Sequence, residues 1–412
     1  MIRVLGAPFV LTGHLEGGPL APLIPDGAVA LDGEVVVAVG PRAALAARYG
    51  RVEWLDAVLL PALVNAHLHL ELSHLAGAVA GGDGLPAWIG RFVQARRAAG
   101  AGPEAAATET RGLAEGLGQL RRGGVAAVGD VSNGLGSLTP LGEAGLAGTV
   151  FHEVFGAAAP AFAAAREQAR LARQGARPRP GLRVVESPHA VYSTDSNGLL
   201  ALLDGDPASL HLAEDPAERE FVASGGGPFA ALRQRMGGPP GQPGWARSAV
   251  ALAAPHLRPG WLAVHLVDLD AADLEALAAC GATVVLCPRS NRHISRAVPP
   301  LDRLLAAGVP LAIGTDSLAS SPSLAPLAEL AALHADFPEV PARRLLPLAW
   351  NGAAVGARGV GCLTPGLAPG LLAAPLGGAR PLDPFEFLVT GEGAFGRPVE
   401  WLARHRPEIR PC

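Results

Sequence analysis

Two histidines separated by one residue end an apolar segment near residue 60. They are the first side chains along the chain whose types and spacing suggest chemistry. The segment Leu59–Ser73 has the pattern of a buried strand and contains His67 and His69. Because side chains alternate between the faces of a strand, these two imidazoles are expected on the same face. Two imidazoles at one strand end can bind a single metal ion, although such a pair is also common as ordinary surface or core histidines.

Further candidate groups follow later apolar segments. His211 closes the segment Ser209–Leu212, and Glu214 lies three residues on. A carboxylate beside a metal-binding histidine can carry the protons of an activated water, whereas the alternative is a helix-capping or surface glutamate after a core histidine. His265 also ends an apolar run, where a core histidine is the simpler interpretation if it is taken alone. Asp316 follows an apolar strand, and a carboxylate there needs a metal or cationic partner.

Together these side chains predict a metal site of three nitrogens and one oxygen. The expected ligands are His67, His69, His211 and Asp316. This set suits Zn²⁺ or Fe²⁺, and such an ion can lower the pKa of a bound water to about 7. The sequence contains no lysine, so no carbamylated lysine can bridge two ions. We therefore predict one divalent ion, with zinc preferred and iron as the alternative, and His265 beside the ligands as a supporting partner or water contact.

Strands that alternate with helices are expected to position these groups. Leu85–Ala98, Pro103–Arg122 and Asp270–Ala279 have helical periodicity. Eight β/α units predict a closed (β/α)₈ barrel of the TIM type, whose reactive groups lie at the carboxyl ends of the strands. The predicted strands are Val58–Ala66, Val125–Asp130, Gly148–Phe155, Leu182–Glu186, Ser209–Leu212, Leu262–His265, Ala282–Cys287 and Val309–Ile313.

Polar residues follow all eight predicted strands, at the end where such a barrel carries its active site. In a core these side chains would be costly, so their position favours function. In chain order they are His67 and His69, Asp130, Glu153, His189, His211 and Glu214, His265, Arg289 with Ser290 and Asn291, and Asp316.

The two ends of the chain differ from the middle. Residues 1–56 contain short β-like pieces separated by turns, and residues 361–412 are rich in proline and glycine. We predict that both ends build one small β-sandwich domain beside a barrel of residues 57–360, with a tail at the carboxyl terminus. The Gly/Pro-rich stretch Ser224–Gly244 is expected to be a mobile loop near the barrel mouth.

Composition narrows the class of protein. The 412 residues are 49% hydrophobic and 17% charged, with a net charge of -4, which predicts a globular protein without a nucleic-acid or membrane partner. Met1–Val10 lacks the pattern of a signal peptide, so a cytoplasmic location is expected. The four cysteines show neither a disulfide framework nor zinc-ribbon spacing. The oligomeric state stays open, with a homodimer as one alternative.

The motifs resemble those of the metal-dependent amidohydrolase superfamily over almost the whole chain. The resemblance rests on His-x-His, His-x-x-Glu, a later histidine and Gly-Thr-Asp, and it favours the mononuclear aminohydrolase branch. That branch includes adenosine, S-adenosylhomocysteine and guanine deaminases and triazine chlorohydrolases. The stretches His67–Ser73, Cys287–Asn291 and Gly314–Ser320, with Trp88 nearby, are most similar to aminofutalosine deaminases.

The resemblance implies hydrolytic deamination of a purine nucleoside-like substrate. Activated water would attack the amino-bearing carbon, Glu214 would carry protons, and His265 and Asp316 would orient the water. The residues expected to contact substrate are His189, Trp88, Glu153, Arg289 and Asn291. Structural roles stay open for some of them: a buried aromatic for Trp88, and turn formation for Arg289 and Asn291.

The function that this resemblance favours is conversion of 6-aminodeoxyfutalosine to futalosine in menaquinone biosynthesis. Alternatives with the same metal site are a chlorohydrolase, a cyclic-amide hydrolase, or a deaminase of adenosine, S-adenosylhomocysteine or methylthioadenosine. A catalytically inactive barrel acting as a scaffold is a further alternative from another class. It is disfavoured because every expected ligand position and the proton-carrying glutamate are filled.

Overall fold

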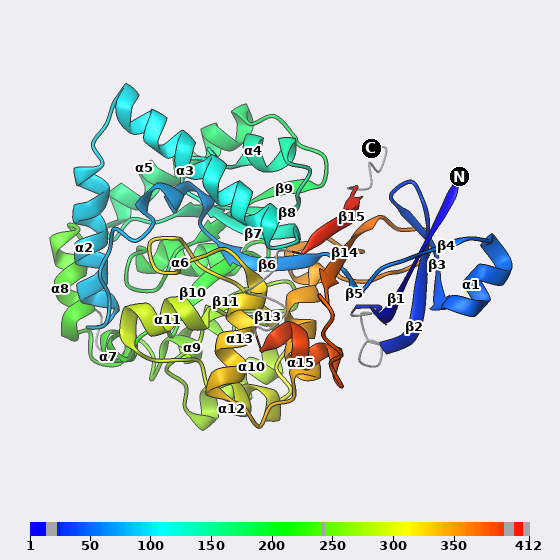
Figure 1. Ribbon diagram of the computed structural model, residues 1–412. Helices are drawn as coiled ribbons and strands as arrows, with labels where there is room; N and C mark the ends of the chain where they lie inside the picture. The colour runs from blue at the N-terminus through cyan, green and yellow to red at the C-terminus, as the bar shows by residue number, and fades with distance from the viewer. Residues whose placement is uncertain (14–22, 240–243, 391–398, 407–412) are drawn as a thin grey trace.

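Two four-stranded parallel sheets form the larger part of the computed structural model, which describes residues 1–13, 23–239, 244–390 and 399–406 (Figure 1). One sheet has the order β6-β7-β8-β9 and the other the order β10-β11-β12-β13. Each of the eight strands overlaps a range predicted from the sequence. Their bounds are β6 Leu63–Leu68, β7 Val125–Ser132, β8 Ala147–Val154, β9 Leu182–Pro188, β10 Ser209–Leu212, β11 Leu262–His265, β12 Thr283–Leu286 and β13 Leu311–Ile313.

The strands are apolar because both faces of these sheets are covered. Every residue of β7 and β8 is buried, as expected for parallel strands with side chains on one face and helices on the other. Backbone hydrogen bonds also connect the two sheets at both edges. His211 N donates to His189 O at 3.0 Å, and Thr315 N donates to His67 O at 2.9 Å. The carboxyl ends of β9 and β10, and of β13 and β6, are therefore neighbours.

Helices follow the strands, and the two long ones predicted from periodicity match their expected ranges. The helices of this part are α2 Leu85–Ala98, α3 Pro103–Arg122, α4 Leu138–Glu143, α5 Ala159–Gly175, α6 Ser196–Leu203, α7 Pro216–Ser224, α8 Gly227–Arg235, α9 Ala249–Ala253, α10 Ala271–Cys280, α11 Pro288–Ser295, α12 Leu301–Ala306, α13 Pro326–Asp336 and α14 Ala342–Leu345. Short 3₁₀ turns lie at η1 Leu70–Leu75, η2 Leu346–Trp350 and η3 Gly352–Val355.

Local capping starts two helices directly after strands that carry candidate site residues. The Asp215 carboxylate accepts a hydrogen bond from Ala217 N at the start of α7, with Pro216 in the first turn. Asp270 and Asp273 form a capping box at the start of α10. The chain is therefore fixed within a few residues of the ends of β10 and β11.

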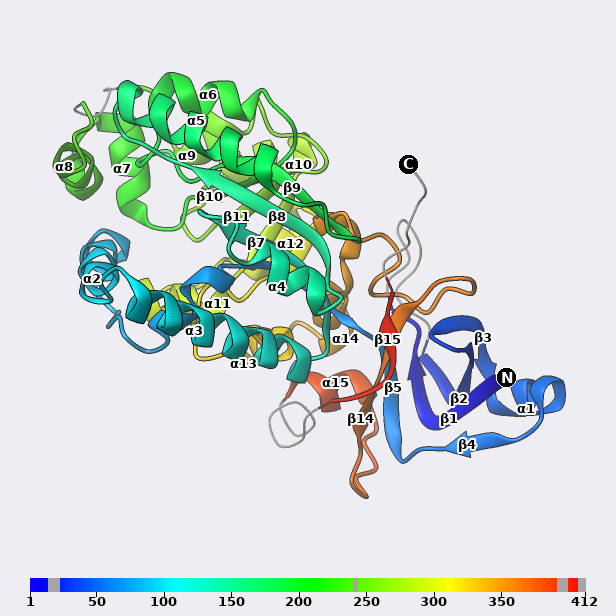
Figure 2. The same cartoon turned by 90° about the horizontal axis from the view of Figure 1, so that it is seen from above.

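Both ends of the chain contribute to a third, seven-stranded sheet of order β15-β14-β5-β1-β2-β3, with β4 paired to β1. The described strands form this one mixed sheet and not two sheets face to face, so the two-layer arrangement of a sandwich is not confirmed. The small sheet adjoins the end where β6 begins, and α2, α7 and α8 lie at the opposite end (Figure 2). Its elements are β1 Ile2–Leu11, β2 Leu23–Asp32, β3 Val35–Pro41, β4 Val52–Trp54, β5 Ala57–Pro61, β14 Pro369–Pro375 and β15 Glu400–His405, with helices α1 Arg42–Tyr49 and α15 Pro384–Val389 nearby in the chain.

The prediction of a single strand over Val58–Ala66 is wrong. The segment is two strands: β5 pairs with β1 and β14 of the small sheet, and β6 pairs with β7. Ala62 N donates to Gly370 O in the small sheet, whereas Leu63 N donates to Gly124 O at the start of β7. Adjacent peptide groups thus belong to different sheets, which an uninterrupted apolar run does not reveal.

The prediction of a loop over Ser224–Gly244 is also wrong for residues 227–235. Residues 227–235 form α8, in which Phe229 is fully buried and stacks on Tyr192 at 3.9 Å between ring centroids. Glycine and proline lie at the start of this helix, where they are tolerated, so their abundance was misleading. Residues 240–243 of the stretch, and the tail residues 407–412, lie outside the described part of the chain.

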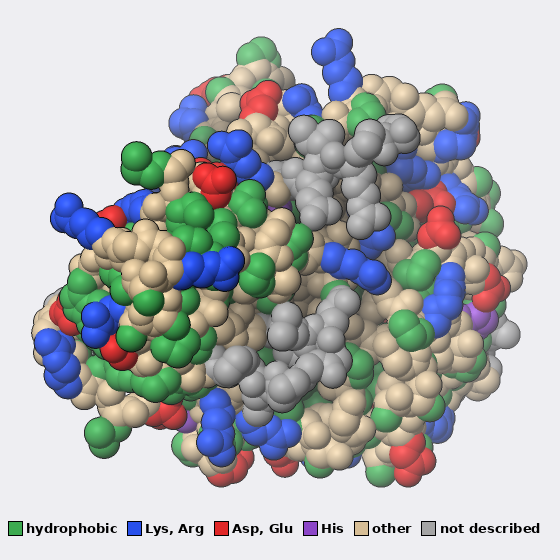
Figure 3. Space-filling model, turned by 90° about the vertical axis from the view of Figure 1, so that its right-hand side faces the viewer, with side chains coloured by type: hydrophobic (Ala, Val, Ile, Leu, Met, Phe, Trp, Pro, Cys, Tyr) green, Lys and Arg blue, Asp and Glu red, His purple; other side chains and the backbone are tan. Residues whose placement is uncertain are grey.

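The face of the molecule seen in Figure 3 carries arginine and acidic side chains interspersed with apolar ones. None of the helices in the described ranges combines the length and hydropathy needed to cross a membrane.

Candidate active site

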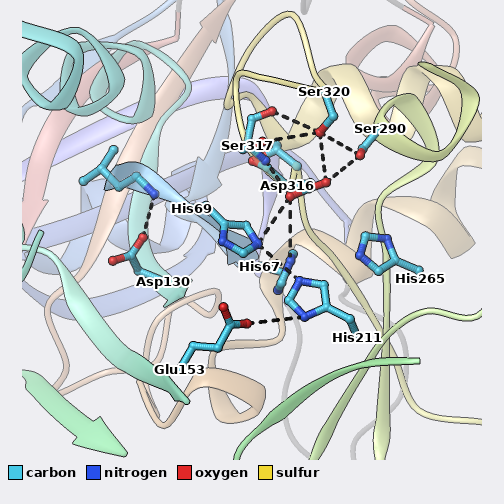
Figure 4. Close-up of polar contacts among 12 residues, drawn as sticks. His67, His69, Asp130, Glu153, His211, His265, Ser290, Asp316, Ser317 and Ser320 are labelled. Carbon is cyan, nitrogen blue, oxygen red and sulfur yellow. Dashed lines mark hydrogen bonds and ion pairs between the residues drawn. The ribbon is translucent and has the colours of Figure 1, made fainter. Parts of the chain in front are cut away.

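Three imidazoles and one carboxylate converge at the carboxyl ends of β6, β10 and β13 (Figure 4). His69 Nε2 lies 3.2 Å from His211 Nε2 and 3.4 Å from Asp316 Oδ1. His67 Nε2 lies 4.0 Å from the same carboxylate oxygen. The four residues proposed as metal ligands are therefore brought together, on elements separated by up to about 250 positions in the chain.

The donor atoms suit a divalent metal ion. His67 is fully buried, and neither of its ring nitrogens has a hydrogen-bond partner in the described structure. Such an unsatisfied buried group is costly unless it binds something. His211 Nδ1 donates to His189 O at 3.2 Å, which leaves the Nε2 lone pair directed at His69. Burial lowers the pKa of His67 well below its ordinary value and that of His69 to about 3, so both rings are neutral, as metal ligands must be.

Asp316 is held as an anion by three donors. Its Oδ2 accepts hydrogen bonds from Ser290 Oγ at 2.6 Å and Ser320 Oγ at 2.9 Å, and its Oδ1 accepts from Ser317 N at 2.7 Å. Burial alone would raise the pKa of Asp316, but the nearby His69 and the Ser290 hydroxyl help lower it to about 2. The carboxylate is thus charged and fixed where it faces the imidazoles.

The approach of β13 to β6 depends on a glycine and a pair of polar side chains. A Cβ at Gly314 would lie 2.7 Å from the Cβ of His67, so any larger residue would displace that histidine. Asn65 Nδ2 donates to Thr315 Oγ1 at 2.8 Å, and Thr315 N donates back to Asn65 Oδ1 at 3.2 Å. The role of Asn65 was not predictable from the sequence, because no local pattern indicates that its partner is Thr315, 250 residues away.

A second pair, Glu214 and His265, lies beside the ligand group. Glu214 Oε2 is 3.5 Å from His265 Nε2, and both side chains are buried. Asn291 Nδ2 donates to His265 Nδ1 at 3.1 Å, so the ring carries its proton on Nε2, toward the glutamate. Burial first, and then the charge of Asp316, raises the pKa of Glu214 well above its ordinary value. A buried glutamate of high proton affinity can take up and release a proton during a reaction.

Two of the expected substrate contacts, Glu153 and His189, also lie here. Glu153 Oε1 is 3.6 Å from His211 Nδ1, and its Oε2 accepts a hydrogen bond from Asn133 Nδ2 at 3.0 Å. The His189 ring lies 4.8 Å from that of His211 and 5.7 Å from that of Phe155, which is 37% exposed. These side chains join the ligand group on the side of β8 and β9.

The other three expected contacts have partners within the protein. Trp88 of α2 is largely buried and stacks on Phe92 at 5.2 Å between ring centroids. Arg289 Nη1 donates to Ser323 Oγ at 2.9 Å. Among the described residues, no contact joins the Arg289 side chain to the imidazoles. Asn291 reaches the site through His265. Contact of these residues with substrate stays a prediction.

Glu71 is a supporting residue that the sequence analysis did not single out. Its carboxylate accepts hydrogen bonds from Ser132 Oγ at 2.5 Å, Asn133 N at 2.9 Å and Gly136 N at 2.6 Å. It therefore holds the turn after β7 that presents Asn133 to Glu153. The position of Glu71, two residues after His69, is the sequence feature that could have indicated a role near the site.

Comparisons with known proteins identify the family of the chain. Residues 58–387 match the Amidohydrolase family. Aminodeoxyfutalosine deaminase of Deinococcus radiodurans is 33% identical over 396 residues, which cover 89% of this chain and 88% of that protein. Helicobacter pylori aminofutalosine deaminase in complex with methylthio-coformycin superposes with a TM-score of 0.81 and 22% identity over 99% of this chain and 100% of that chain. An adenosine deaminase from Xanthomonas campestris with bound zinc gives a TM-score of 0.76 and 25% identity, covering 100% of this chain and 94% of that one.

The chain therefore belongs to the amidohydrolase family. It is a hydrolase that acts on carbon–nitrogen bonds, and within that class it is a deaminase. The structural neighbours also place the two parallel sheets and their helices in the TIM-type α/β class.

Proposed function

We propose that this protein is a metal-dependent aminohydrolase of an adenine-type ring, with 6-aminodeoxyfutalosine as substrate and futalosine as product in menaquinone biosynthesis. The observation that carries the proposal is the approach of His211 and Asp316 to His69, at 3.2 and 3.4 Å from its Nε2, beside the Glu214–His265 pair. The choice of substrate is supported by the 33% identity to an aminodeoxyfutalosine deaminase over most of both chains.

The ion of the proposed site is a single zinc, held by the four ligands described above. Zinc fits three neutral imidazoles and one carboxylate, and the zinc-bound relative supports the choice. When bound, the ion supplies a Lewis acid that lowers the pKa of a coordinated water. The absence of lysine argues against a second ion bridged by a carbamylated side chain.

The protein side chains would then move protons and hold the reactants. Glu214 takes a proton from the attacking water on a carboxylate oxygen and delivers it to the ring nitrogen next to the amino-bearing carbon. The second water proton reaches the amino group, which leaves as ammonia while the oxygen stays on the ring. Asp316 accepts, and His265 Nε2–H donates, hydrogen bonds that orient the attacking oxygen. His189 would contact the ring, and Glu153 is proposed as a further substrate contact.

The eight parallel strands are proposed to act as one closed (β/α)₈ barrel. The hydrogen bonds at both edges of the two sheets support this, because they bring all eight carboxyl ends to one mouth. Reactive groups of such barrels lie at that end.

The zinc-loaded protein is expected to release ammonia fastest from 6-aminodeoxyfutalosine. The panel would contain adenosine, S-adenosylhomocysteine, methylthioadenosine, guanine and a chlorotriazine as competitors, with kcat/KM measured for each. A preference for methylthioadenosine would support deamination as the reaction but contradict 6-aminodeoxyfutalosine as the substrate. Chloride release from the triazine, without ammonia from any purine, would favour the chlorohydrolase alternative.

A further inference from the structure

The backbone is strained where Glu214 and His265 are presented. Ala213 has φ 50°, His265 φ 82° and Leu266 φ 52°, all in the left-handed region that residues other than glycine rarely adopt. Such conformations persist only when the surroundings hold them in place. Three strained residues on two neighbouring turns therefore call for a restraint that fixes both turns.

Part of that restraint is a set of backbone hydrogen bonds between the turns. Ala213 O accepts from Val267 N at 2.8 Å and from Asp268 N at 2.9 Å, and Leu212 O accepts from Leu266 N at 3.1 Å. The turn after β11 is thereby attached to the turn after β10. These backbone hydrogen bonds hold the two turns together, but they do not fix the turn after β11 to the surrounding helices.

The turn after β10 is fixed to α7 by Glu218, whose Oε2 accepts a hydrogen bond from Glu214 N at 3.1 Å. One arginine connects the turn after β11 to the helices. Arg219 lies on α7, which begins two residues after Glu214. Its Nε donates to Asp268 Oδ2 at 2.6 Å, and its Nη2 donates to Asp268 O at 3.2 Å and to Asp273 Oδ2 at 2.7 Å. Since Asp268 lies three residues after His265, a single guanidinium connects α7 to the turn after β11 and to α10.

The far end of this contact is itself fixed. Asp273 has a side chain with no exposed surface, and its Oδ1 accepts hydrogen bonds from Ser248 Oγ at 2.5 Å and lies 2.9 Å from Arg247 Nη2. Arg247 also contacts Asp270 at 2.6 Å. Arg247 therefore shares Asp270 and Asp273 with Arg219, but it has no described contact with Asp268 or the turn before it.

We propose that Arg219 is a positioning residue that sets the separation of Glu214 and His265, acting through Asp268 and Asp273. Its described contacts are with Asp268, Asp270 and Asp273, none of which is a proposed metal ligand. The inference deepens the proposed function, because it assumes that Glu214 and His265 handle the proton in the reaction.

The first test compares Arg219→Lys with Arg247→Lys, a matched control that loses the same guanidinium shape. Lysine keeps the charge but cannot make the forked contacts of Arg219. Arg219→Lys is expected to lower kcat about tenfold to hundredfold with little change in KM, because a small misplacement of reacting groups has effects of that order. Affinity for a coformycin-type transition-state analogue should fall in parallel. Arg247→Lys should change neither kcat nor the affinity for the analogue. Equal effects of the two variants would overturn the proposal.

A second measurement does not depend on activity. Hydrogen–deuterium exchange of the amides of Leu266, Val267 and Asp268 should be faster in Arg219→Lys than in the wild type and unchanged in Arg247→Lys. Asp268→Asn, which weakens the same contact from its other end, should behave like Arg219→Lys. Unchanged exchange in both variants would refute the positioning role, whatever the activity of the wild type. Inactivity of the wild type on every purine would refute the proposed function and leave this result unaffected.

Discussion

Replacing Glu214 by glutamine is expected to reduce turnover by about 10²- to 10⁴-fold, the range typical of a lost proton-transfer group. Glutamine preserves the shape of a side chain that is almost fully buried, but it can neither accept the proton of the attacking water nor pass it to the ring. Because Glu214 is not among the proposed ligands, bound zinc per chain should not change. Steady-state kinetics and metal analysis on the same preparation check both parts.

An exposed glutamate gives the matched control for this substitution. Glu275 lies on the solvent side of α10, so Glu275→Gln should retain wild-type turnover. Turnover of Glu214→Gln within a few-fold of the wild type would remove this residue from the mechanism. A loss of zinc in the same variant would show that it acts as a ligand.

Replacing His67 by alanine is expected to abolish zinc binding together with activity. Neither nitrogen of the fully buried ring has a hydrogen-bond partner among the described residues, and replacing the ring by alanine takes away one of the four proposed ligand atoms. In the wild type, zinc at a hundred times its dissociation constant should stabilise the fold by about 2.7 kcal/mol, because it binds only the folded state. Thermal unfolding of His67→Ala should show no such increase in Tm on addition of zinc.

The partly exposed His256 provides the comparison for this variant. It contacts Asp204 at 2.6 Å and has no described contact with the site. His256→Ala should keep both its zinc content and the zinc-dependent increase in Tm. Full zinc occupancy in His67→Ala would contradict the assignment of this histidine as a ligand.

Much of this site was predictable because it lies at strand ends. An apolar run followed by a polar residue marks the carboxyl end of a buried parallel strand, and the fold brings all such ends together. For that reason His67, His211 and Asp316 could be placed in one group from the sequence alone. The long helices α2 and α3 were equally legible, since each has helical periodicity and a proline in its first turn.

Features that depend on a distant partner were not predictable. The break between β5 and β6 is set by hydrogen bonds from Ala62 and Leu63 to two different sheets, while both residues look alike as apolar strand residues. Arg219 resembles a solvated arginine on a polar helix face until Asp268 and Asp273 are placed against it. Arg289, predicted to contact substrate, has two partners that the sequence did not indicate: it donates to Ser323 and lies 3.6 Å from Glu329.

The most direct test of the central claim is ammonia release from 6-aminodeoxyfutalosine by the zinc-loaded protein and by the same preparation after chelation. We predict stoichiometric ammonia and futalosine from the loaded protein, none above background after chelation, and recovery when zinc is restored. Undiminished ammonia release from the fully chelated protein would contradict metal-dependent deamination. An absence of ammonia from every purine, with zinc bound at one ion per chain, would contradict the proposed reaction while leaving the metal site in place.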